Sequence, residues 1–361
     1  MTEDVDLTGL DIDTTAPALV SGATGYLAGW IVKGLLDAGV TVHAAVRDPG
    51  NEAKVAHLKR LGDQAPGELR LFSADLLEPG SYAEAMAGCA YVFHTASPFI
   101  RSFEDPQTEL VDPAVKGTTS VLTTANETPS VCRIVLTSSV AAIYSDAADC
   151  AFAPGGVLTE DVWNTRSTLT HEPYSLSKTL AEKAAWQIAG AQDRWRLVVI
   201  NPALVIGPAL NDAPTSASFT IVQQLGDGTM KLGVPRVSVP LVDVRDVARA
   251  HLAAAYLPTA QGRHIVRAVD TDVFEMTKTL REEYASTYPL PKRAIPKALV
   301  WLLAPSIGLE RDFVKLNVGH PIRLDNSKSV RRLGMTYRPV AESMQDMFAQ
   351  MIQWGTFDQA T

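Results

Sequence analysis

Cysteine is scarce in this chain and is not arranged for metal binding. Only Cys89, Cys132 and Cys150 occur among 361 residues, and no pair has the Cys-x-x-Cys or Cys-x-x-x-Cys spacing. Neither a zinc site nor a framework of disulfides follows from them, as is typical of a protein from a reducing compartment. We expect all three to be buried or partly buried structural thiols.

Long apolar segments and a secretory leader are also missing. The longest strongly apolar run, ALVWLLA at 298–304, is far shorter than the roughly 20 residues that a membrane-spanning helix needs. The first residues, MTEDVDLTGLDIDTT, lack the basic region and the apolar core of a secretory signal. Their acidic character predicts a disordered leader over residues 1–15. We therefore expect a cytoplasmic protein.

An excess of positive charge is absent as well. The chain has 40 acidic and 32 basic residues, which gives a net charge of −8. A protein that binds nucleic acid or an anionic membrane would present a basic surface, so neither partner is expected. The content of 46% hydrophobic and 20% charged residues is ordinary for a globular enzyme.

What the sequence does contain is a regular alternation of apolar strands and helical patterns. The buried strand expected at 18–21 is followed by a helical pattern that ends near Gly39. Further strands are predicted at 40–46, 69–76, 90–96, 132–139 and 196–207, with helical stretches between them. This alternation predicts an α/β fold with a Rossmann-type doubly wound parallel sheet, covered on both faces.

Beyond Pro208 the pattern becomes looser, with a polar loop, short strands and a proline-rich stretch. We predict a Rossmann domain over residues 16–208 and a smaller substrate-binding lobe over 209–361. Some segments of the second part are expected to return to the first. Substrate is expected between the lobes, at the carboxyl ends of the parallel strands.

A glycine-rich turn joins the first strand to its helix, with the pattern Gly22-x-x-Gly25-x-x-Ala28. Such a turn directs backbone N–H groups and the positive end of the helix dipole at an anion, while a small third residue lets the helix approach the sheet. The spacing differs from Gly-x-Gly-x-x-Gly, so the motif by itself could be a tight turn. Its place at the start of a βαβ unit favours dinucleotide binding.

The end of the second strand indicates which dinucleotide. Proteins that select NAD place an acidic residue there, whereas this chain has Val46 followed by Arg47. The guanidinium of arginine suits a 2′-phosphate, and Lys54 could supply a second cation. Asp48 could serve only in a local turn, and Arg47 could instead be a solvated surface charge. We predict NADP.

Two further motifs carry acid–base chemistry. In PYSLSK, Tyr174 and Lys178 lie one helical turn apart. A nearby ammonium is expected to lower the pKa of the phenol, which can then donate a proton to a carbonyl oxygen as hydride arrives at carbon. Ser138 and Ser139 end the fifth predicted strand, where a hydroxyl can bond the same oxygen.

At these residues the chain resembles the extended short-chain dehydrogenase/reductase family. It is most similar to the group of dihydroflavonol and cinnamoyl-CoA reductases, which includes bacterial and fungal ketone and aldehyde reductases. The resemblance covers roughly residues 17–355, and its segments include SGATGYLAGWIVKGLL, AAVRDPGNEAKVAHL, ADLLEPGSY, YVFHTASP, RIVLTSSVAA, YSLSKTLAEKAAW, NPALVIGP and VDVRDVARAHLAA.

The resemblance implies a role for each matching residue, with NADPH as cofactor and no metal. Ser139 would bind the carbonyl, Tyr174 would donate the proton, and Lys178 would lower its pKa and hold the nicotinamide ribose. The residues expected to bind the cofactor are Gly22, Ala23, Thr24, Gly25, Tyr26 and Leu27 at the pyrophosphate, Arg47 and Lys54 at the 2′-phosphate, Asp75 and Leu76 at the adenine, Thr95 and Ala96 alongside the cofactor, and Pro202 and Val205 near the nicotinamide.

Departures from the family pattern bear on the substrate. Ala114 stands where many members have an asparagine, although plant reductases of this group often lack it too. Tyr144 replaces the asparagine that faces the substrate's phenol ring in the plant flavonoid enzymes, and HEPYSLSK replaces the cinnamoyl-CoA reductase motif NWYCYGK. The departures argue against both substrates and favour a smaller or more apolar ketone or aldehyde. Residues expected at the substrate pocket are Phe99, Ile100, Tyr144 and the loop 211–219 with Phe219.

The sequence therefore predicts an NADPH-dependent carbonyl reductase, a monomer or homodimer that acts on a small molecule. Two alternatives within the superfamily stay open, a sugar-nucleotide epimerase and a hydroxysteroid dehydrogenase. An epimerase would need cations in the C-terminal lobe for a diphosphate. Arg245 and Arg249 are there, but their helical spacing beside acidic residues favours a structural role. A non-catalytic NADP sensor is a third alternative, although such proteins tend to lose the tyrosine or lysine.

Overall fold

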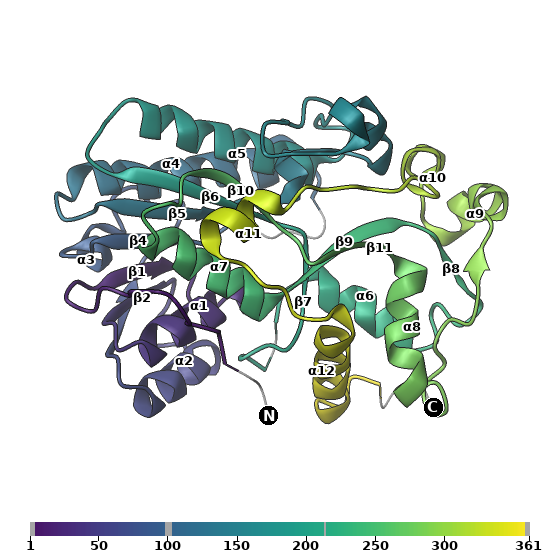
Figure 1. The fold of residues 1–361 in the computed structure, drawn as a ribbon, viewed down its shortest axis with the longest axis horizontal. Coiled ribbons are helices and arrows are strands. Elements are labelled where there is room, and N and C mark those ends of the chain that lie inside the picture. The colour runs from purple at the N-terminus through teal and green to yellow at the C-terminus, as the bar shows by residue number, and fades with distance from the viewer. Residues whose placement is uncertain (1–3, 98–102, 213, 358–361) are drawn as a thin grey trace.

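The computed structural model describes residues 4–97, 103–212 and 214–357. Its centre is a seven-stranded sheet in the order β10-β6-β5-β4-β1-β2-β3, in which every neighbouring pair is parallel (Figure 1). The strands are β1 (Ala18–Ser21), β2 (Val42–Val46), β3 (Leu69–Ser73), β4 (Tyr91–His94), β5 (Arg133–Thr137), β6 (Arg196–Pro202) and β10 (Gly262–Val266). The predicted fold class is confirmed.

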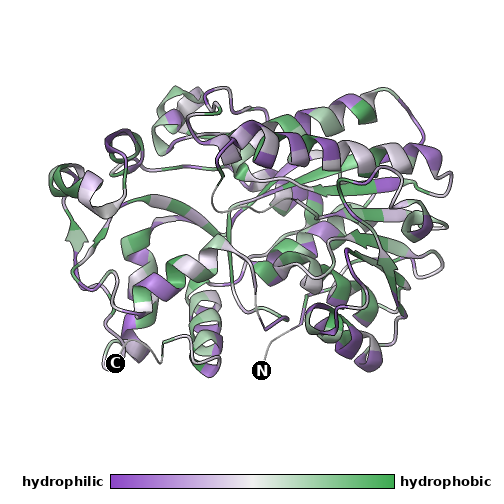
Figure 2. Cartoon of the chain, turned by 180° about the vertical axis from the view of Figure 1, so that it is seen from behind, coloured by the Kyte–Doolittle hydropathy of each residue, from purple (hydrophilic) through white to green (hydrophobic). Residues whose placement is uncertain are grey.

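Helices cover both faces of this sheet, because successive side chains of its strands point to opposite sides. In β1, Ala18 and Val20 pack into one apolar cluster and Leu19 into the other. The first face carries α1 (Tyr26–Asp37), α2 (Glu52–Gln64) and α7 (Val244–Tyr256), and the second carries α3 (Ala83–Met86), α4 (Asp112–Glu127) and α5 (Pro173–Gly190). Figure 2 shows the sheet strands largely in green, with purple residues on the outer helices.

The predicted sixth strand is wrong as a single element. It divides into β6 and β7 (Leu204–Ile206), and β7 belongs to a second sheet. Pro202 has no N–H group with which to continue the ladder, so the chain leaves the central sheet there. Ala203 still donates its N–H group to the carbonyl of Val266 in the edge strand β10.

The second sheet and its helices form a smaller layer beside the central sheet (Figure 1). Its strands run in the order β11-β9-β7, and a two-stranded ribbon pairs β12 with β8. The elements are β8 (Val234–Pro235), β9 (Ser238–Asp243), β11 (Val269–Asp272), β12 (Ala294–Ile295), α6 (Ala217–Gly226), α8 (Val273–Tyr284), α9 (Lys297–Leu303), α10 (Arg311–Asn317) and α12 (Val340–Gln353).

Three elements that follow residue 208 lie with the central sheet, namely α7, β10 and α11 (Ser327–Leu333). Their return requires the chain to cross between the two sheets more than once. The domain boundary near residue 208 stays a prediction. No helix in the described part of the chain has both the length and the apolar character needed to cross a membrane.

The N-terminal segment differs from the expected disordered leader from Asp4 onward. Val5 is only 5% exposed and belongs to the main apolar cluster. Asp4 pairs with Lys33 of α1 at 2.9 Å, and Asp6 pairs with Arg249 of α7 at 3.3 Å. The acidic side chains that suggested a solvated leader thus bind cations on two helices.

One cysteine also differs from the expectation that all three are buried or partly buried, since Cys132 is exposed.

Candidate active site

The glycine-rich turn after β1 has a backbone that only glycine adopts easily. Gly22 has a φ of +63°, and a Cβ atom placed on it would lie 3.0 Å from the Cα atom of Ala96. The Gly25 N–H group closes the turn on the Gly22 carbonyl at 2.9 Å. Ala28 is buried, which lets α1 lie close to the sheet. The backbone is therefore open to a ligand at the start of α1.

The first turn of α1 is suited to an anion. Gly25 caps the helix without a side-chain hydrogen bond, and the first N–H groups of a helix have no partner within it. Thr24 and Leu27 flank this point, and their contact with a pyrophosphate stays a prediction. The N–H group of Ala23 instead bonds the carbonyl of Ala45 in β2 at 3.2 Å. An anionic dinucleotide fits this cradle.

The side chain of Tyr26 points away from the cradle. Its hydroxyl donates to the carbonyl of Gly207 at 2.7 Å, and its ring meets that of Phe219 edge-on at 5.2 Å between centroids. Phe219, expected in the substrate pocket, is only 7% exposed and also packs against Trp354. Tyr26 can thus offer a ligand its backbone N–H group, while the Phe219 ring is engaged in core packing.

Ser21, a buried residue that was not predicted from the sequence, connects the glycine turn to the end of the neighbouring strand β4. Ser21 Oγ accepts the N–H groups of Thr95 and Ala96, both at 3.1 Å. These bonds hold Thr95 and Ala96 beside the glycine turn, and their predicted place alongside the cofactor stays a prediction. His94 contacts the same hydroxyl at 2.9 Å, and burial together with the nearby charge of Lys178 lowers the pKa of the imidazole to about 3.

The two cations predicted for a 2′-phosphate are both exposed. Among the ion pairs of the described residues, none involves Arg47 or Lys54, so no carboxylate competes for them there. Asp48 Oδ1 accepts the N–H group of Gly50 at 2.9 Å, so Asp48 forms the local turn that was considered for it from the sequence. At the end of β3, Asp75 Oδ1 accepts the Leu77 N–H group at 2.8 Å.

The remaining residues predicted at the cofactor or the substrate lie in different settings. Leu76 is half-buried against Gly117 of α4, Pro202 is buried at the end of β6, and Val205 lies in β7. Tyr144 packs against a small apolar cluster, and burial raises the pKa of its hydroxyl. Phe99 and Ile100 lie outside the described residues.

The three predicted catalytic residues come together where β5 and α5 meet. Ser139 caps a short turn, with its Oγ accepting the Ala141 N–H group at 3.1 Å, and its hydroxyl lies close enough to Tyr174 to lower the pKa of the phenol. Lys178 lies one helical turn further along α5, with its Nζ 5.7 Å from the centroid of the Tyr174 ring. The ammonium also donates to Ser97 Oγ at 2.8 Å. The Tyr174 side chain is 40% exposed, which leaves it accessible to a ligand.

The acid–base properties of the pair differ from the expectation. Desolvation within the site raises the pKa of Tyr174, and the nearby Ser139 hydroxyl opposes this shift. Burial lowers the pKa of Lys178 to about 8. We expected the ammonium to lower the pKa of Tyr174, but desolvation dominates in the protein alone. The phenol is therefore protonated at neutral pH, the form that can donate a proton.

A buried polar network behind the catalytic residues was not found from the sequence. The Glu182 carboxylate accepts hydrogen bonds from Ser138 at 2.5 Å, Asn201 at 2.8 Å and Arg263 at 2.6 Å. It lies one turn of α5 beyond Lys178. Tyr174, Lys178 and Glu182 are four residues apart, which places them on one face of the helix, so the sequence spacing could have predicted a role for Glu182. No feature of the neighbouring sequence indicates that Arg263, on the edge strand β10, is its partner.

The arginines considered for a sugar diphosphate are engaged in the fold. Arg245 is 2% exposed and binds Asp243 at 2.7 Å and Asp346 at 2.9 Å. Arg249 binds Asp6 and the carbonyl of Thr8. Both have the structural role that their spacing favoured.

Comparison with known proteins decides the family. The model of the NAD dependent epimerase/dehydratase family matches residues 18–267, well over half of the chain. The chain belongs to this family. The predicted membership among the extended short-chain dehydrogenases/reductases is thereby confirmed.

Relatives within the family are reductases. The chain is 37% identical over 330 residues to cinnamoyl-CoA reductase CAD2 of Medicago truncatula, covering 91% of this chain and 93% of the relative. It is 36% identical over 340 residues to tetraketide alpha-pyrone reductase 1 of Arabidopsis thaliana, covering 93% and 95%. Yeast methylglyoxal/isovaleraldehyde reductase Gre2, solved with NADPH, matches with a TM-score of 0.77 and 26% identity over 94% of this chain and 99% of the other. This family member is an NAD(P)-dependent reductase of carbonyl-type substrates.

Proposed function

We propose that the protein is an NADPH-dependent carbonyl reductase that converts a ketone or an aldehyde to an alcohol, with Tyr174 as the proton donor. The observation that carries the proposal is the convergence of Ser139, Tyr174 and Lys178 beside the glycine turn. When bound, NADPH supplies the hydride that adds to the carbonyl carbon.

The chain's own residues bind and protonate the substrate oxygen. The Ser139 hydroxyl lies near enough to the Tyr174 phenol to affect its pKa, so a carbonyl oxygen placed between the two hydroxyls can accept from both. Tyr174 is protonated at neutral pH and gives its proton to the oxygen as negative charge develops there. The positive charge of Lys178 stabilises the tyrosinate that remains.

The preference for NADPH over NADH rests on Arg47 and Lys54. Both side chains are exposed, with Arg47 directly after β2, where a free ribose would call for an acidic partner, and Lys54 in the first turn of α2. Their cationic groups match the charge and geometry of a 2′-phosphate. Gre2, which has a similar fold, was solved with NADPH.

We propose a small or apolar ketone or aldehyde as the substrate class. Tyr144 occupies the position that faces the phenol ring in plant flavonoid reductases, and it packs against an apolar cluster, while burial and the nearby carboxylates of Asp270 and Glu172 raise the pKa of its hydroxyl. A bulky ring packed on apolar side chains, in place of an asparagine amide, favours alkyl or aryl groups over polyphenols.

The test is the consumption of NADPH by the purified protein with a panel of aldehydes, ketones, a dihydroflavonol and a cinnamoyl thioester, with NADH in parallel. We expect turnover of simple aldehydes or ketones, faster with NADPH. Turnover confined to the dihydroflavonol or the thioester would overturn the substrate class, and binding of NADPH without any turnover would overturn the enzyme itself.

A further inference from the structure

The residue before the catalytic helix has an unfavourable backbone conformation. Glu172 has a φ of +50° and a ψ of +54°, and it is the one non-glycine residue with positive φ in the described part of the chain. The left-handed region is disfavoured for side chains with a Cβ atom, and Pro173 further restricts the residue that precedes it. Such a conformation persists only where its surroundings hold it.

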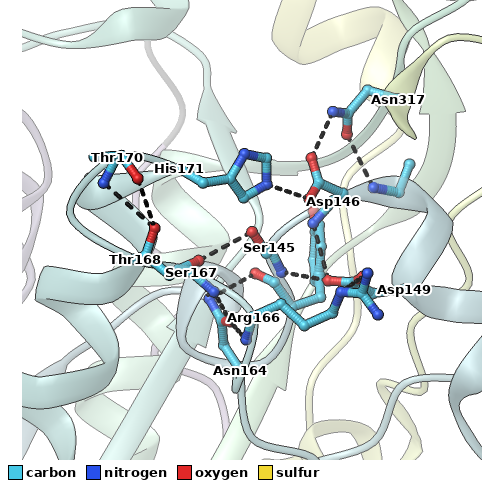
Figure 3. A network of polar contacts seen from close by, with 12 residues as sticks. Ser145, Asp146, Asp149, Asn164, Arg166, Ser167, Thr168, Thr170, His171 and Asn317 are labelled. Carbon is cyan, nitrogen blue, oxygen red and sulfur yellow. Dashed lines mark hydrogen bonds and ion pairs between the residues drawn. The ribbon is translucent and has the colours of Figure 1, made fainter. Parts of the chain in front are cut away.

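The neighbouring residue supplies a rigid attachment. His171 Nε2 lies 2.6 Å from Asp146 Oδ2, and the Asp146 side chain is only 3% exposed (Figure 3). Asn317 donates from Nδ2 to Asp146 Oδ1 at 2.8 Å, and its own Oδ1 accepts the Ala147 N–H group at 2.9 Å. Both carboxylate oxygens of Asp146 are therefore held, and the His171 ring is fixed to a buried anion.

This attachment joins the two segments that carry the catalytic hydroxyls. Asp146 follows Ser139 by seven residues, and His171 precedes Tyr174 by three. Between His171 and the helix lies only Glu172, whose carbonyl accepts the Leu176 N–H group at 3.1 Å and so starts α5. Asn317 brings in a third segment, the end of α10.

We propose that His171, Asp146 and Asn317 form a clamp that holds Glu172 in its left-handed conformation and so positions the Tyr174 hydroxyl against Ser139. The inference rests on the proposed function, because positioning matters only if Tyr174 donates the proton. All three are positioning residues, since they act through the backbone at Glu172.

Charged groups around His171 determine how the clamp depends on pH. Asp146, Glu172 and Asp149 face the ring, and Glu310 approaches Glu172. The bond to Asp146 raises the pKa of His171. Below that raised pKa the bond is between an imidazolium and a carboxylate, and above it a neutral ring keeps only the weaker N–H bond. The clamp is therefore strongest at low pH and weakens as pH rises through the His171 pKa.

Enzyme kinetics test the clamp in the full-length protein. We expect His171→Leu to lower kcat by about 10- to 100-fold, because a small displacement of a catalytic group has an effect of that order, with the KM for NADPH unchanged. His171→Gln keeps a donor without the charge and should recover part of the loss. The ratio of wild-type to His171→Gln rates should fall as pH rises. His320→Gln changes a half-buried histidine whose ring contacts the Lys315 carbonyl and not Asp146; it is the matched control and should behave as wild type.

A second substitution separates positioning from general stability. Glycine adopts positive φ freely, so Glu172→Gly should restore most of the activity of His171→Leu, although it restores none of the lost contacts. If the double variant is as slow as His171→Leu, or if His171→Leu has wild-type kinetics, the clamp is wrong.

A readout without activity keeps the clamp and the proposed function distinguishable. Hydrogen exchange at the amides of residues 174–177 should accelerate in His171→Leu and in Asp146→Asn, while the C-terminal half of α5 keeps its wild-type rate. Unchanged exchange at 174–177 would overturn the clamp even in an active enzyme. Accelerated exchange in a protein that reduces no carbonyl would support the backbone clamp and overturn the proposed function.

Discussion

Ser138 and Ser139 are adjacent at the end of β5, but their hydroxyls have different partners. Ser138 donates to the buried Glu182 carboxylate at 2.5 Å, whereas Ser139 Oγ accepts the Ala141 N–H group and lies beside Tyr174, whose pKa it lowers. One serine thus anchors α5 to the sheet while its neighbour faces the open side of the site. The division supports Ser139 as the residue that binds substrate.

The buried contacts of Glu182, which attach α5 to the sheet, should contribute strongly to stability. Glu182 and Arg263 form a buried pair at 2.6 Å, and removing one partner leaves a charge without compensation. We expect Arg263→Met to lower the free energy of unfolding by about 3–5 kcal/mol in urea denaturation. Arg236→Met removes the exposed pair with Asp272 and should cost at most about 1 kcal/mol. Equal losses of unfolding free energy in the two variants would show that the buried Glu182–Arg263 pair does not attach α5 to the sheet.

The rate of carbonyl reduction should fall in alkaline solution. Burial lowers the pKa of Lys178 from its usual 10.5 to about 8, so its positive charge is lost as pH rises through about 8. The charge stabilises the tyrosinate left after proton donation, and kcat/KM should therefore decline above that pH. Lys178→Arg keeps its charge and should remove this decline, whatever its absolute rate. An identical alkaline limb in wild type and Lys178→Arg would show that Lys178 is not its source.

Cofactor selectivity should depend on Arg47. A hydrogen bond to a charged group contributes about 1.5–3 kcal/mol, so Arg47→Ala should weaken NADPH binding by roughly 10- to 100-fold and leave NADH binding unchanged. Fluorescence titration of both cofactors measures this. Lys59→Ala removes a cation of α2 that pairs with Glu52 at 2.5 Å, and it should change neither affinity. A parallel loss of both cofactors in Arg47→Ala would rule out a role at the 2′-phosphate.

The glycine turn should not tolerate a side chain. At Gly22 the positive φ and the 3.0 Å approach of a Cβ atom to Ala96 both oppose alanine. We expect Gly22→Ala to destabilise the protein by about 1–3 kcal/mol and to weaken NADPH binding. Gly190→Ala places its methyl group in open space at the end of α5 and should leave both unchanged. Thermal unfolding with and without NADPH measures both effects in the two variants. Equal melting temperatures of Gly22→Ala and Gly190→Ala would contradict the tight turn.

Local patterns were sufficient to predict the sheet class and the residues that gather at its carboxyl edge. Buried parallel strands are short and apolar, and the ends of such strands meet on one side, so Gly22, Thr95 and Ser139 could be expected near one another. The break after Pro202 was missed because the apolar run continues through Leu204, although its residues enter a different sheet.

Contacts between distant segments could not be predicted. The bond of Asp146 to Asn317 joins residues 171 positions apart, and no periodicity relates them. The same holds for Arg263 with Glu182, and for the acidic leader that binds Lys33 and Arg249. The raised pKa of Tyr174 follows from desolvation within the site, which its helical spacing from Lys178 does not reveal.

The most direct test of the central claim is a single-turnover measurement of NADPH oxidation by wild type and Tyr174→Phe with one aldehyde that the wild type reduces. We predict that the variant binds NADPH with unchanged affinity and reduces the aldehyde about 10²- to 10⁴-fold more slowly, since it lacks only the proton donor. A variant with the wild-type rate would contradict the assignment of Tyr174 as the group that protonates the substrate.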